Sequence, residues 1–465
     1  MKKVYTNGRG AKKHSVSRII GKPSAGRRRR EKRVRHRGPK PKVSYSGVPS
    51  VASKNYFKAL AVVAAIVILL FGVACLVVAS SSSISSAVAH SEREIKVPAG
   101  PKSEPPGLYA AAAILTDRES GRVLCEKSSH ERLPVASTTK IMTALVVRDR
   151  LSLSDKVTIS PQAAQVGEQA VGFIAGETLT VEDLLWSVLV LSANDAAEAL
   201  AEYSVGSGQA FADLMNKKAA QLGLKDSHFL NPHGLDQPGH YSSAYDLAVL
   251  GRELLKDPVL AKMVAATKHD IPGPPGQPVR NLYSHNEILA QYQGANGIKT
   301  GYTAAAGFCL VASATRDKKQ LIAVVLNSSH RASDVTALFD YGFTSTRRVI
   351  FVGEGQNLGR SRVSAFPRRY VKVVPQTELA ALSLNGSGDA FRVRVTFARK
   401  ASGQVRKGTP LGAVESWLNN NPIEREKAVA ANAAAAPGPI TGTMAFLWYT
   451  LCWMGRIVSA PFRIF

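Results

Sequence analysis

Hydrophobic and polar positions divide this chain into segments of different character. Residues 59–79 form an unbroken apolar run of 21 residues, which is long enough to cross a bilayer as one helix. Residues 80–107 are rich in Ser and Pro and lack a period, so they predict a flexible stalk. Residues 1–58 are polar and basic, and we interpret them as a tail on the other side of the membrane helix.

A mixed pattern of strands and helices follows between residues 108 and 346. The expected strands are 109–115, 122–126, 308–315 and 320–327. The expected helices are 137–148, one opened by the capping pair Thr180 and Asp183, and 195–203 with Asn194 as its cap. Strands at both ends with helices between them predict one α/β (α+β) domain, built on an antiparallel sheet with helices.

The remainder of the chain changes character twice. Residues 347–418 contain short alternating runs with Gly turns and predict a small β-rich domain, and residues 419–443 are expected to form a linker. Residues 444–465 mix aromatic and aliphatic side chains with Arg456 and Arg463, which is typical of a segment lying in the membrane interface. The alternative is a helix packed on the chain's own domains.

The net charge of +26 is unevenly distributed, since residues 1–58 hold 19 Lys and Arg against one acid. Positive charge before a first membrane helix keeps that side in the cytoplasm, so the domains after residue 79 are expected outside the membrane. Such a tail can also bind nucleic acid, but aromatics interleaved with its basic residues are nearly absent, which favours contact with membrane lipid and no nucleic-acid partner. A cleaved signal peptide, with Ala87 and Ala89 at its cleavage site, is the alternative to a retained anchor.

Cysteine and histidine positions argue against a metal or disulfide framework. Of the four cysteines only Cys125 and Cys309 could pair outside the membrane, and both lie in apolar runs where a buried free thiol is the usual state. There is no Cys-x-x-Cys, and no two histidines are three or four residues apart. We therefore expect no metal and no cofactor.

Candidate chemistry begins with Ser137 and Lys140, the only Ser-x-x-Lys of the chain. At this spacing on a helix the two side chains lie on one face within contact distance. A lysine that loses its proton through burial or nearby positive charge can take the proton of a serine as that serine attacks. A helix N-terminus at Ser137 would also favour a developing oxyanion.

Two further motifs support a catalytic interpretation of this pair. Ser192-Ala193-Asn194 lies at the break between two predicted helices, and Lys299-Thr300-Gly301 lies at the start of a predicted strand. Together the three motifs form the set found in penicillin-binding proteins and class A β-lactamases.

The surrounding sequence resembles the low-molecular-mass penicillin-binding proteins, the serine D-Ala-D-Ala carboxypeptidases. The resembling stretches are LPVASTTKIMTALV, LSANDAA, NPHGLDQPGHYSSAYDLA, NGIKTGYTAAAGFCLVA and LFDYGF. The resemblance covers about residues 108–343 and extends to the layout of the β-rich domain and C-terminal anchor. The front of the chain departs from the family, which usually has a cleaved signal peptide.

The resemblance implies an activity and a set of roles. The enzyme would remove the terminal D-alanine from peptidoglycan pentapeptides through an acyl-enzyme, and β-lactams would inhibit it. The implied catalytic residues are Ser137 as nucleophile, Lys140 as general base and Ser192 as proton relay. The implied substrate-binding residues are Asn194, Lys299, Thr300, Gly301, Tyr302, whose backbone N–H would complete the oxyanion hole with that of Ser137, and Arg331.

Several alternatives remain open from the sequence. Arg331 could form a surface salt bridge instead of meeting the substrate carboxylate. A β-lactamase would need a Glu-x-x-Leu-Asn segment between residues 192 and 299, which is absent. A non-catalytic wall-binding protein and an enzyme that cleaves crosslinks are also compatible with the motifs. His233 and His240 are expected to have structural roles, because Lys140 already supplies a base.

Overall fold

The computed structural model describes residues 61–62, 65, 88–100, 103–274, 276–364, 369–401, 404–434, 443–444 and 446–452. The chain divides into two units, Met1–Ser83 and Ile84–Phe465. The predicted basic tail and nearly all of the predicted membrane helix lie outside the described residues. No helix within the ranges given above combines the length and apolar character needed to cross a bilayer.

An antiparallel sheet of five strands lies at the centre of the first folded part, in the order β3-β2-β10-β9-β8. Its strands are β2 (Ala112–Asp117), β3 (Val123–Lys127), β8 (Ala295–Thr303), β9 (Gly307–Arg316) and β10 (Lys319–Leu326). Both predicted hairpins are confirmed, with shifted ends. Among the described strands β8 pairs with β9 alone, so one edge of β8 is left for another partner.

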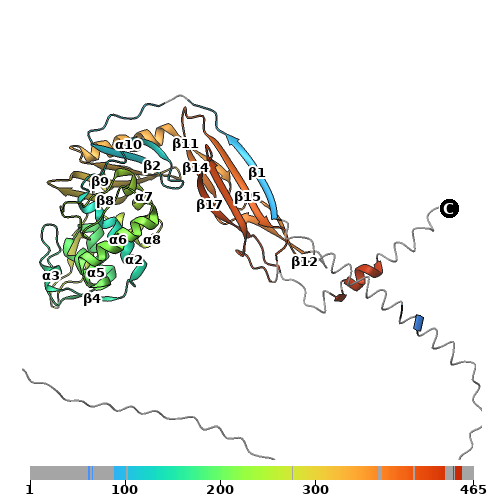
Figure 1. Ribbon diagram of the computed structural model, residues 1–465, viewed down its shortest axis with the longest axis horizontal. Coiled ribbons are helices and arrows are strands. Elements are labelled where there is room, and N and C mark those ends of the chain that lie inside the picture. Colours follow the sequence, from blue (N-terminus) through green and yellow to red (C-terminus); the bar gives the residue numbers. More distant parts are fainter. Residues whose placement is uncertain are drawn as a thin grey trace, which may run out of the picture. The chain divides into compact units, whose positions relative to one another are not determined.

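Helices cover both faces of this sheet (Figure 1). The helices are α2 (Lys140–Arg150), α3 (Pro161–Ala164), α4 (Val181–Trp186), α5 (Asn194–Val205), α6 (Gly208–Leu222), α7 (Ala244–Leu254), α8 (Pro258–Val264), α9 (Ile288–Gln291) and α10 (Arg331–Ser345). Two short turns of other geometry are η1 (Ala136–Thr139) and η2 (Ser187–Leu191). Two small hairpins complete this part: β4 (Lys156–Thr158) with β5 (Thr178–Thr180), and β6 (Lys268–Ile271) with β7 (Arg280–Tyr283).

The strand β10 separates two apolar cores, because successive side chains of a strand point to opposite faces. Ile322 and Val324 pack into a core with α2, α4, α5 and α7. Leu321 and Ala323 pack into a second core with α10. The predicted antiparallel sheet with helices is therefore confirmed, and its two-sided cover explains why β10 has no polar face.

The second folded part is a six-stranded sheet in the order β1-β15-β16-β17-β13-β12, beside a two-stranded pair β11-β14. Its strands are β1 (Val88–Lys96), β11 (Thr346–Val352), β12 (Gly359–Ser364), β13 (Arg369–Pro375), β14 (Leu379–Leu384), β15 (Ala390–Ala398), β16 (Pro410–Leu418) and β17 (Asn421–Ala430). β15 alternates buried and half-buried residues along its whole length. The predicted β-rich character of this region is confirmed.

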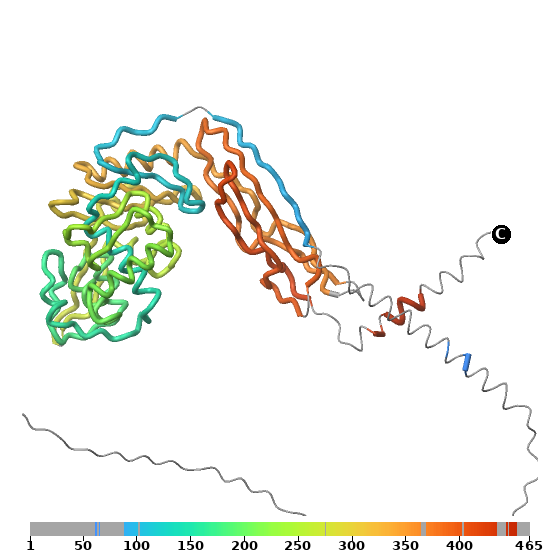
Figure 2. The backbone as a smooth tube through the Cα atoms, viewed as in Figure 1, coloured from blue at the N-terminus to red at the C-terminus, as the bar shows by residue number. Residues whose placement is uncertain are grey.

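Two segment predictions near this sheet are wrong. The predicted stalk contains β1, whose nine residues pair with β15 about three hundred positions later in the chain (Figure 2). The predicted linker contains β17, which pairs with both β16 and β13. β1 is ordered by pairing with a distant strand, and such pairing leaves little trace in local sequence. β17 instead pairs mainly with β16, the strand directly before it in the chain.

All four apolar clusters of the described chain lie between Ala89 and Ala434. Ala89 packs against the cluster of the β sheet, and Ala434 packs against the small cluster that includes Val363 and Val405. The segment 84–434 therefore contains the complete core of both folded parts, and it needs neither terminal apolar segment to bury that core.

Candidate active site

Ser137 lies in the tight 3-10 turn η1, directly before α2. The backbone N–H and the hydroxyl of Thr138 both donate to the Val135 carbonyl, and Ala136 adopts a left-handed φ of 49°. The single helix predicted from 137 to 148 is thus a 3-10 turn followed by an α-helix that ends at Arg150. The turn holds the hydroxyl of Ser137 toward the lysine that follows it.

Lys140 is fully buried and joins three segments of the site. Its Nζ lies 2.7 Å from Ser137 Oγ, 2.6 Å from Asn194 Oδ1 and 2.8 Å from the His233 carbonyl oxygen. A neutral amine has two N–H groups and one lone pair. The two carbonyl oxygens accept the two N–H groups, so the lone pair is left facing the Ser137 hydroxyl.

The electrostatic environment favours this neutral amine. Burial, and after it the positive charge of Lys299, hold the pKa of Lys140 well below its ordinary value. Burial and the nearby Arg331 likewise lower the pKa of Lys299 to about 7. Burial and neighbouring positive charge therefore lower the pKa of both lysines, and the positive charge gathered here suits an anionic ligand.

Ser192 and Asn194 lie where η2 ends and α5 begins. Ser192 turns the chain with a left-handed φ of 72°. Asn194 was expected to cap the helix, and this is wrong: Ala193 occupies the cap position. The Asn194 amide instead accepts a hydrogen bond from Lys140 and donates to the Gly167 carbonyl at 2.9 Å. Within the described chain, Lys140 bonds to Asn194 but not to Ser192.

The Lys-Thr-Gly motif lies on the edge strand β8, beside the nucleophile. A Cβ atom on Gly301 would lie 3.1 Å from the backbone nitrogen of Ser137, so glycine permits this close contact. Lys299 Nζ donates to the Thr300 carbonyl at 2.9 Å. Tyr302 is 58% exposed, and its ring lies 4.6 Å from that of Phe308.

Arg331 begins α10 and forms a bidentate ion pair with Glu287, at 2.8 and 2.9 Å. Its guanidinium also lies 5.3 Å from the ring centre of Phe308. Arg331 therefore forms a salt bridge, as the alternative in the sequence analysis held. Because its charge lowers the pKa of Lys299, Arg331 nevertheless belongs to the same electrostatic site.

Sequence reasoning included residues 231–235 in a stretch that resembles the family, but it did not predict that the His233 carbonyl meets Lys140. Gly234 has a φ of +86°, and a Cβ there would lie 2.0 Å from the Ala136 carbonyl oxygen. The Gly234 N–H donates to Asn231 Oδ1 at 2.7 Å. The loop therefore packs against the nucleophile turn through backbone atoms.

His233 and His240 are neutral, buried supports of this arrangement. Burial lowers the pKa of His233 to about 3 and that of His240 to about 4. His240 Nδ1 accepts the Leu230 N–H, so its other nitrogen donates to Thr139 Oγ1 at 2.9 Å. His233 Nδ1 accepts the Leu235 N–H at 3.2 Å.

Asp195 has a structural role in the site that the three motifs did not reveal. Its buried carboxylate accepts N–H groups from Val171, Gly172 and Phe173, at 3.2, 2.9 and 3.3 Å. The Asn194 N–H donates to the Gln169 carbonyl at 2.7 Å. Residues 167–173 are thus fixed as a wall of the site.

The described residues contain no cluster of His, Cys, Asp or Glu that could hold a metal ion. Cys125 and Cys309 are buried free thiols, as expected from their apolar surroundings. A pocket beside the nucleophile turn is lined by Ala136, Leu235, Tyr241 and Ala305, among others.

Comparison with known proteins identifies the family. The model of the D-alanyl-D-alanine carboxypeptidases, peptidase family S11, matches residues 100–330. DacF of Bacillus subtilis, a D-alanyl-D-alanine carboxypeptidase, is 34% identical over 314 residues, which cover 66% of this chain and 80% of the relative. DacC of Escherichia coli, another such enzyme, is 34% identical over 339 residues, covering 69% and 83%.

Solved structures agree with these sequence matches. Penicillin-binding protein 5 from Haemophilus influenzae superposes with a TM-score of 0.55 at 28% identity, covering 71% of this chain and 99% of that chain. A D-alanyl-D-alanine carboxypeptidase from Mycobacterium tuberculosis gives a TM-score of 0.50 at 32% identity, covering 53% and 96%. The fold is that of the penicillin-binding proteins and β-lactamases, and the resemblance seen in the sequence is confirmed. The chain belongs to the serine D-alanyl-D-alanine carboxypeptidases of peptidase family S11, the hydrolases that trim peptidoglycan stem peptides in cell-wall remodelling.

Proposed function

We propose that Ser137 is the acylated nucleophile of this enzyme and Lys140 its general base. Ser137 Oγ attacks the carbonyl carbon of the penultimate D-alanine while its proton passes to the Lys140 amine. The C–N bond to the terminal D-alanine then breaks, and Ser192 relays the proton to the leaving nitrogen. Water cleaves the ester, which frees the shortened peptide and restores the serine. The observation that carries this proposal is the 2.7 Å contact between Lys140 Nζ and Ser137 Oγ.

The substrate is held by groups on the other side of the nucleophile. Lys299, Thr300 and Arg331 receive the terminal carboxylate, whose negative charge offsets the mutual repulsion of the two cations. Asn194 bonds the peptide backbone. The free edge of β8 is suited to pair with an extended peptide. The backbone N–H groups of Ser137 and Tyr302 stabilise the oxyanion, and the tight contact at Gly301 supports their closeness.

A β-lactam is expected to acylate the same serine and to leave slowly. The reasons are that its ring carbonyl meets the same nucleophile, and that the chain has no Glu-x-x-Leu-Asn segment between residues 192 and 299 to activate a water. Rapid penicillin turnover would point instead to a β-lactamase.

We place the enzyme at the outer face of a bacterial cytoplasmic membrane, held by lipid contacts of its terminal segments. The apolar run at 59–79 supports a first attachment. In the described part of 443–452, the helix exposes Met444, Leu447, Trp448 and Leu451 by 54 to 68%. Exposed apolar and aromatic side chains of this kind favour the membrane interface.

The experiment that tests the function measures D-alanine released from a peptide ending in D-Ala-D-Ala. The wild-type chain should release D-alanine, while Ser137→Ala should lose activity by at least about a thousandfold and keep its melting temperature. Release by Ser137→Ala at the wild-type rate would falsify the assignment of the nucleophile. Cleavage of crosslinked peptides without D-alanine release would indicate an endopeptidase instead.

A further inference from the structure

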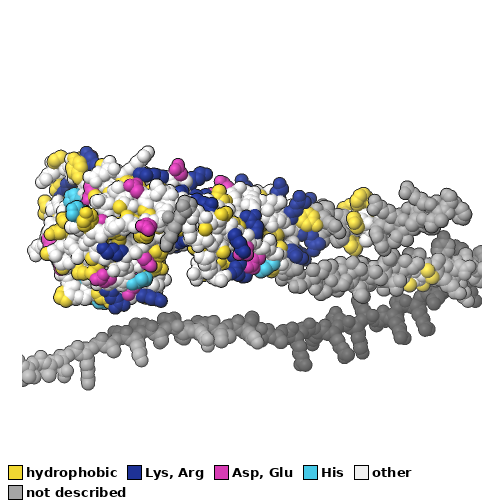
Figure 3. Space-filling model, turned by 90° about the horizontal axis from the view of Figure 1, so that it is seen from above, with side chains coloured by type: hydrophobic (Ala, Val, Ile, Leu, Met, Phe, Trp, Pro, Cys, Tyr) yellow, Lys and Arg dark blue, Asp and Glu magenta, His cyan; other side chains and the backbone are white. Residues whose placement is uncertain are grey.

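The positive charge of the folded chain is concentrated in its β-rich part. Residues 347–434 hold 15 Lys and Arg against six Asp and Glu, whereas residues 108–346 hold 21 against 24. Figure 3 shows Lys and Arg side chains spread over the surface of the β-rich part. Catalysis in the first part does not require this excess, so the β-rich part has its own reason to be basic.

Many of these cations gather at one end of the six-stranded sheet, which we call the basic end. Arg360 lies opposite Lys372 in the β12–β13 register. The backbone N–H of Arg362 donates to the Arg399 carbonyl, and the backbones of Arg362 and Lys400 form an isolated β-bridge. The members of the basic end are Arg360, Arg362, Lys372, Arg399, Lys400, Arg406 and Lys407.

The turn carrying Arg406 and Lys407 reaches the same end. The Gly408 N–H donates to the Ala430 carbonyl, and the Ala431 N–H donates to the Lys372 carbonyl. Four separate stretches of chain therefore converge there. All seven cations are exposed except Arg362, which is half-buried.

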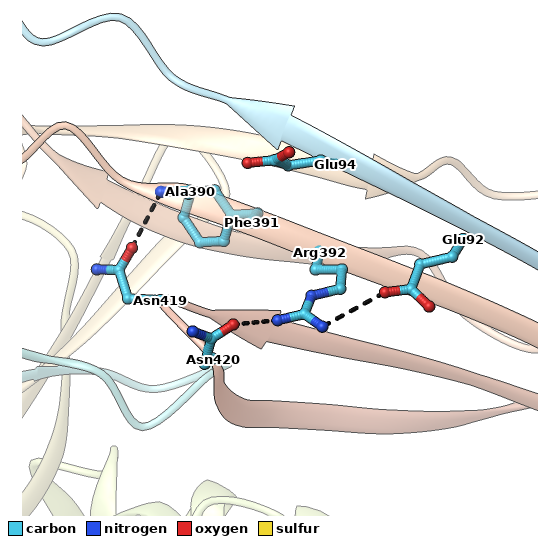
Figure 4. A pocket seen from close by; sticks show the side chains of 7 residues that line it. All are labelled: Glu92, Glu94, Ala390, Phe391, Arg392, Asn419 and Asn420. Atoms are coloured by element: carbon cyan, nitrogen blue, oxygen red, sulfur yellow. Dashed lines mark hydrogen bonds and ion pairs between the residues drawn. The ribbon is translucent and has the colours of Figure 1, made fainter.

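Three arginines elsewhere on the same sheet have acidic partners, whereas the cations of the basic end have none among the described residues. Arg392 at the opposite end of β15 contacts Glu92 and Asn420 (Figure 4). Arg394 also pairs with Glu92, and Arg425 pairs with Glu415. Among the described residues, no carboxylate lies within ion-pair distance of any member of the basic end. Uncompensated like charges repel, so this end is suited to an anionic partner.

The course of the chain indicates which anionic partner is meant. The chain enters the sheet at Val88. This residue pairs with Ala398, which directly precedes Arg399 in the sequence. The chain leaves the sheet at Ala434. This residue pairs with Val405, which directly precedes Arg406 in the sequence. In sequence, the apolar run 59–79 precedes the entry and the apolar stretch 444–455 follows the exit. Both candidate lipid-binding segments are thus tethered to the basic end.

An aromatic side chain completes the surface. Tyr370 is 45% exposed and lines one pocket together with Arg360 and Lys372. Tyrosine beside exposed cations is typical of proteins at the headgroup level of a membrane. A soluble polyanion would also attract the cations, but it would not account for the position of both tethers.

We propose that the basic end is a docking surface for the anionic headgroups of membrane phospholipids, separate from the apolar anchors. Headgroup binding by the sheet would fix the β-rich part upright on the membrane surface instead of leaving it on a loose tether. Each cation near an anionic surface adds to affinity, and the effect weakens with salt. The inference rests on the membrane attachment proposed above.

The test uses the fragment 84–434, which lacks both apolar segments and contains the complete core of both folded parts. Its sedimentation is measured with vesicles of phosphatidylcholine alone, and of phosphatidylcholine containing one third phosphatidylglycerol. Binding should require phosphatidylglycerol and should fall at least about tenfold in 0.5 M NaCl. The triple variant Arg360→Gln, Lys372→Gln, Arg399→Gln should bind at least about tenfold more weakly than the parent fragment.

A matched variant, Arg392→Gln, Arg394→Gln, Arg425→Gln, removes the same charge from ion-paired positions of the same sheet. It should retain binding within about threefold. Equal losses in both variants would overturn the proposal, as would equal binding to both kinds of vesicle. Tighter binding to soluble polyphosphate than to phosphatidylglycerol vesicles would do so too, in favour of an anionic polymer. D-alanine release by each fragment keeps this outcome distinct from failure of the proposed function.

Discussion

At the scale of single residues, the site depends on keeping Lys140 neutral inside the protein. Burying a charged ammonium without a paired anion is costly, so burial favours the amine. Lys299 and Arg331 extend the effect, because each added positive charge disfavours the next proton. The substrate carboxylate then meets the cations that remain charged, while Lys140 stays able to accept the proton of Ser137.

The first prediction concerns the acid side of the activity profile. The positive charge of Lys299 lowers the pKa of Lys140, so in Lys299→Gln the pKa of Lys140 should rise. Activity is lost as pH falls through that pKa, because the protonated lysine has no lone pair for Ser137. The acid limb of kcat/KM for D-alanine release should therefore move up by roughly one pH unit, in addition to a loss of carboxylate binding at every pH.

The control for this experiment is Lys156→Gln, which removes an exposed lysine from β4. Its profile should match that of the wild-type chain. An acid limb that stays in place in Lys299→Gln would show that Lys299 does not set the protonation of Lys140.

Motif spacing revealed the side chains of the site better than its backbone groups. Ser137, Lys140 and Asn194 meet through hydrogen bonds as their motifs predict. The His233 carbonyl was not predictable, because every residue has a carbonyl and only the fold decides which one meets Lys140. The ion pair between Arg331 and Glu287 joins residues 44 positions apart, and no local pattern connects them.

At the scale of elements, the nucleophile turn η1 is held between the edge strand β8 and the loop at residues 231–235. Gly301 and Gly234 allow these two segments to contact the turn. A Cβ on Gly234 would collide with the Ala136 carbonyl, and one on Gly301 would be tightly packed against Val135 and Ser137. Helical periodicity and the capping pattern correctly predicted the start of α4 and its capping box. They could not predict η1 or η2, because 3-10 and π-helical turns arise from tertiary packing around the site.

The second prediction tests the contact between the 231–235 loop and the nucleophile turn. In Gly234→Ala the new Cβ would meet the Ala136 carbonyl, so the loop must retreat and carry the His233 carbonyl away from Lys140. We expect kcat/KM to fall at least about tenfold, together with a stability loss of about 1–3 kcal/mol from the left-handed backbone.

Gly206→Ala provides the comparison for this variant. Gly206 has a similar φ of +91° at the end of α5, and within the described chain its Cβ would have open space. This variant should lose stability but keep kcat/KM within about twofold. Equal kcat/KM in both variants would separate the 231–235 loop from catalysis.

At the scale of the whole molecule, the chain forms one strand of the β sheet before it forms the catalytic part. It then returns to complete the sheet with β12, β13 and β15–β17. The sequence did not predict this arrangement, because β1 is an edge strand with seven of its nine residues exposed, and its partner is distant in sequence. The β-rich nature of residues 347–418 was predictable, since β15 and β13 alternate in burial along their length.

The third prediction separates β1 from a stalk. A fragment beginning at Pro98 lacks β1, whereas one beginning at Ile84 retains it, and both keep the catalytic part. Loss of β1 leaves the edge of β15 unpaired and exposes Val393, Val395 and Phe397 of the sheet core. Amide hydrogen exchange in β15 should become at least about tenfold faster in the shorter fragment, while labelling of Ser137 by a fluorescent penicillin should remain. Unchanged protection of β15 would mean that the sheet does not need β1 and that residues 88–96 act only as a tether. If penicillin labelling and the amide protection of β15 were both lost, the catalytic part would depend on an intact sheet for its own stability.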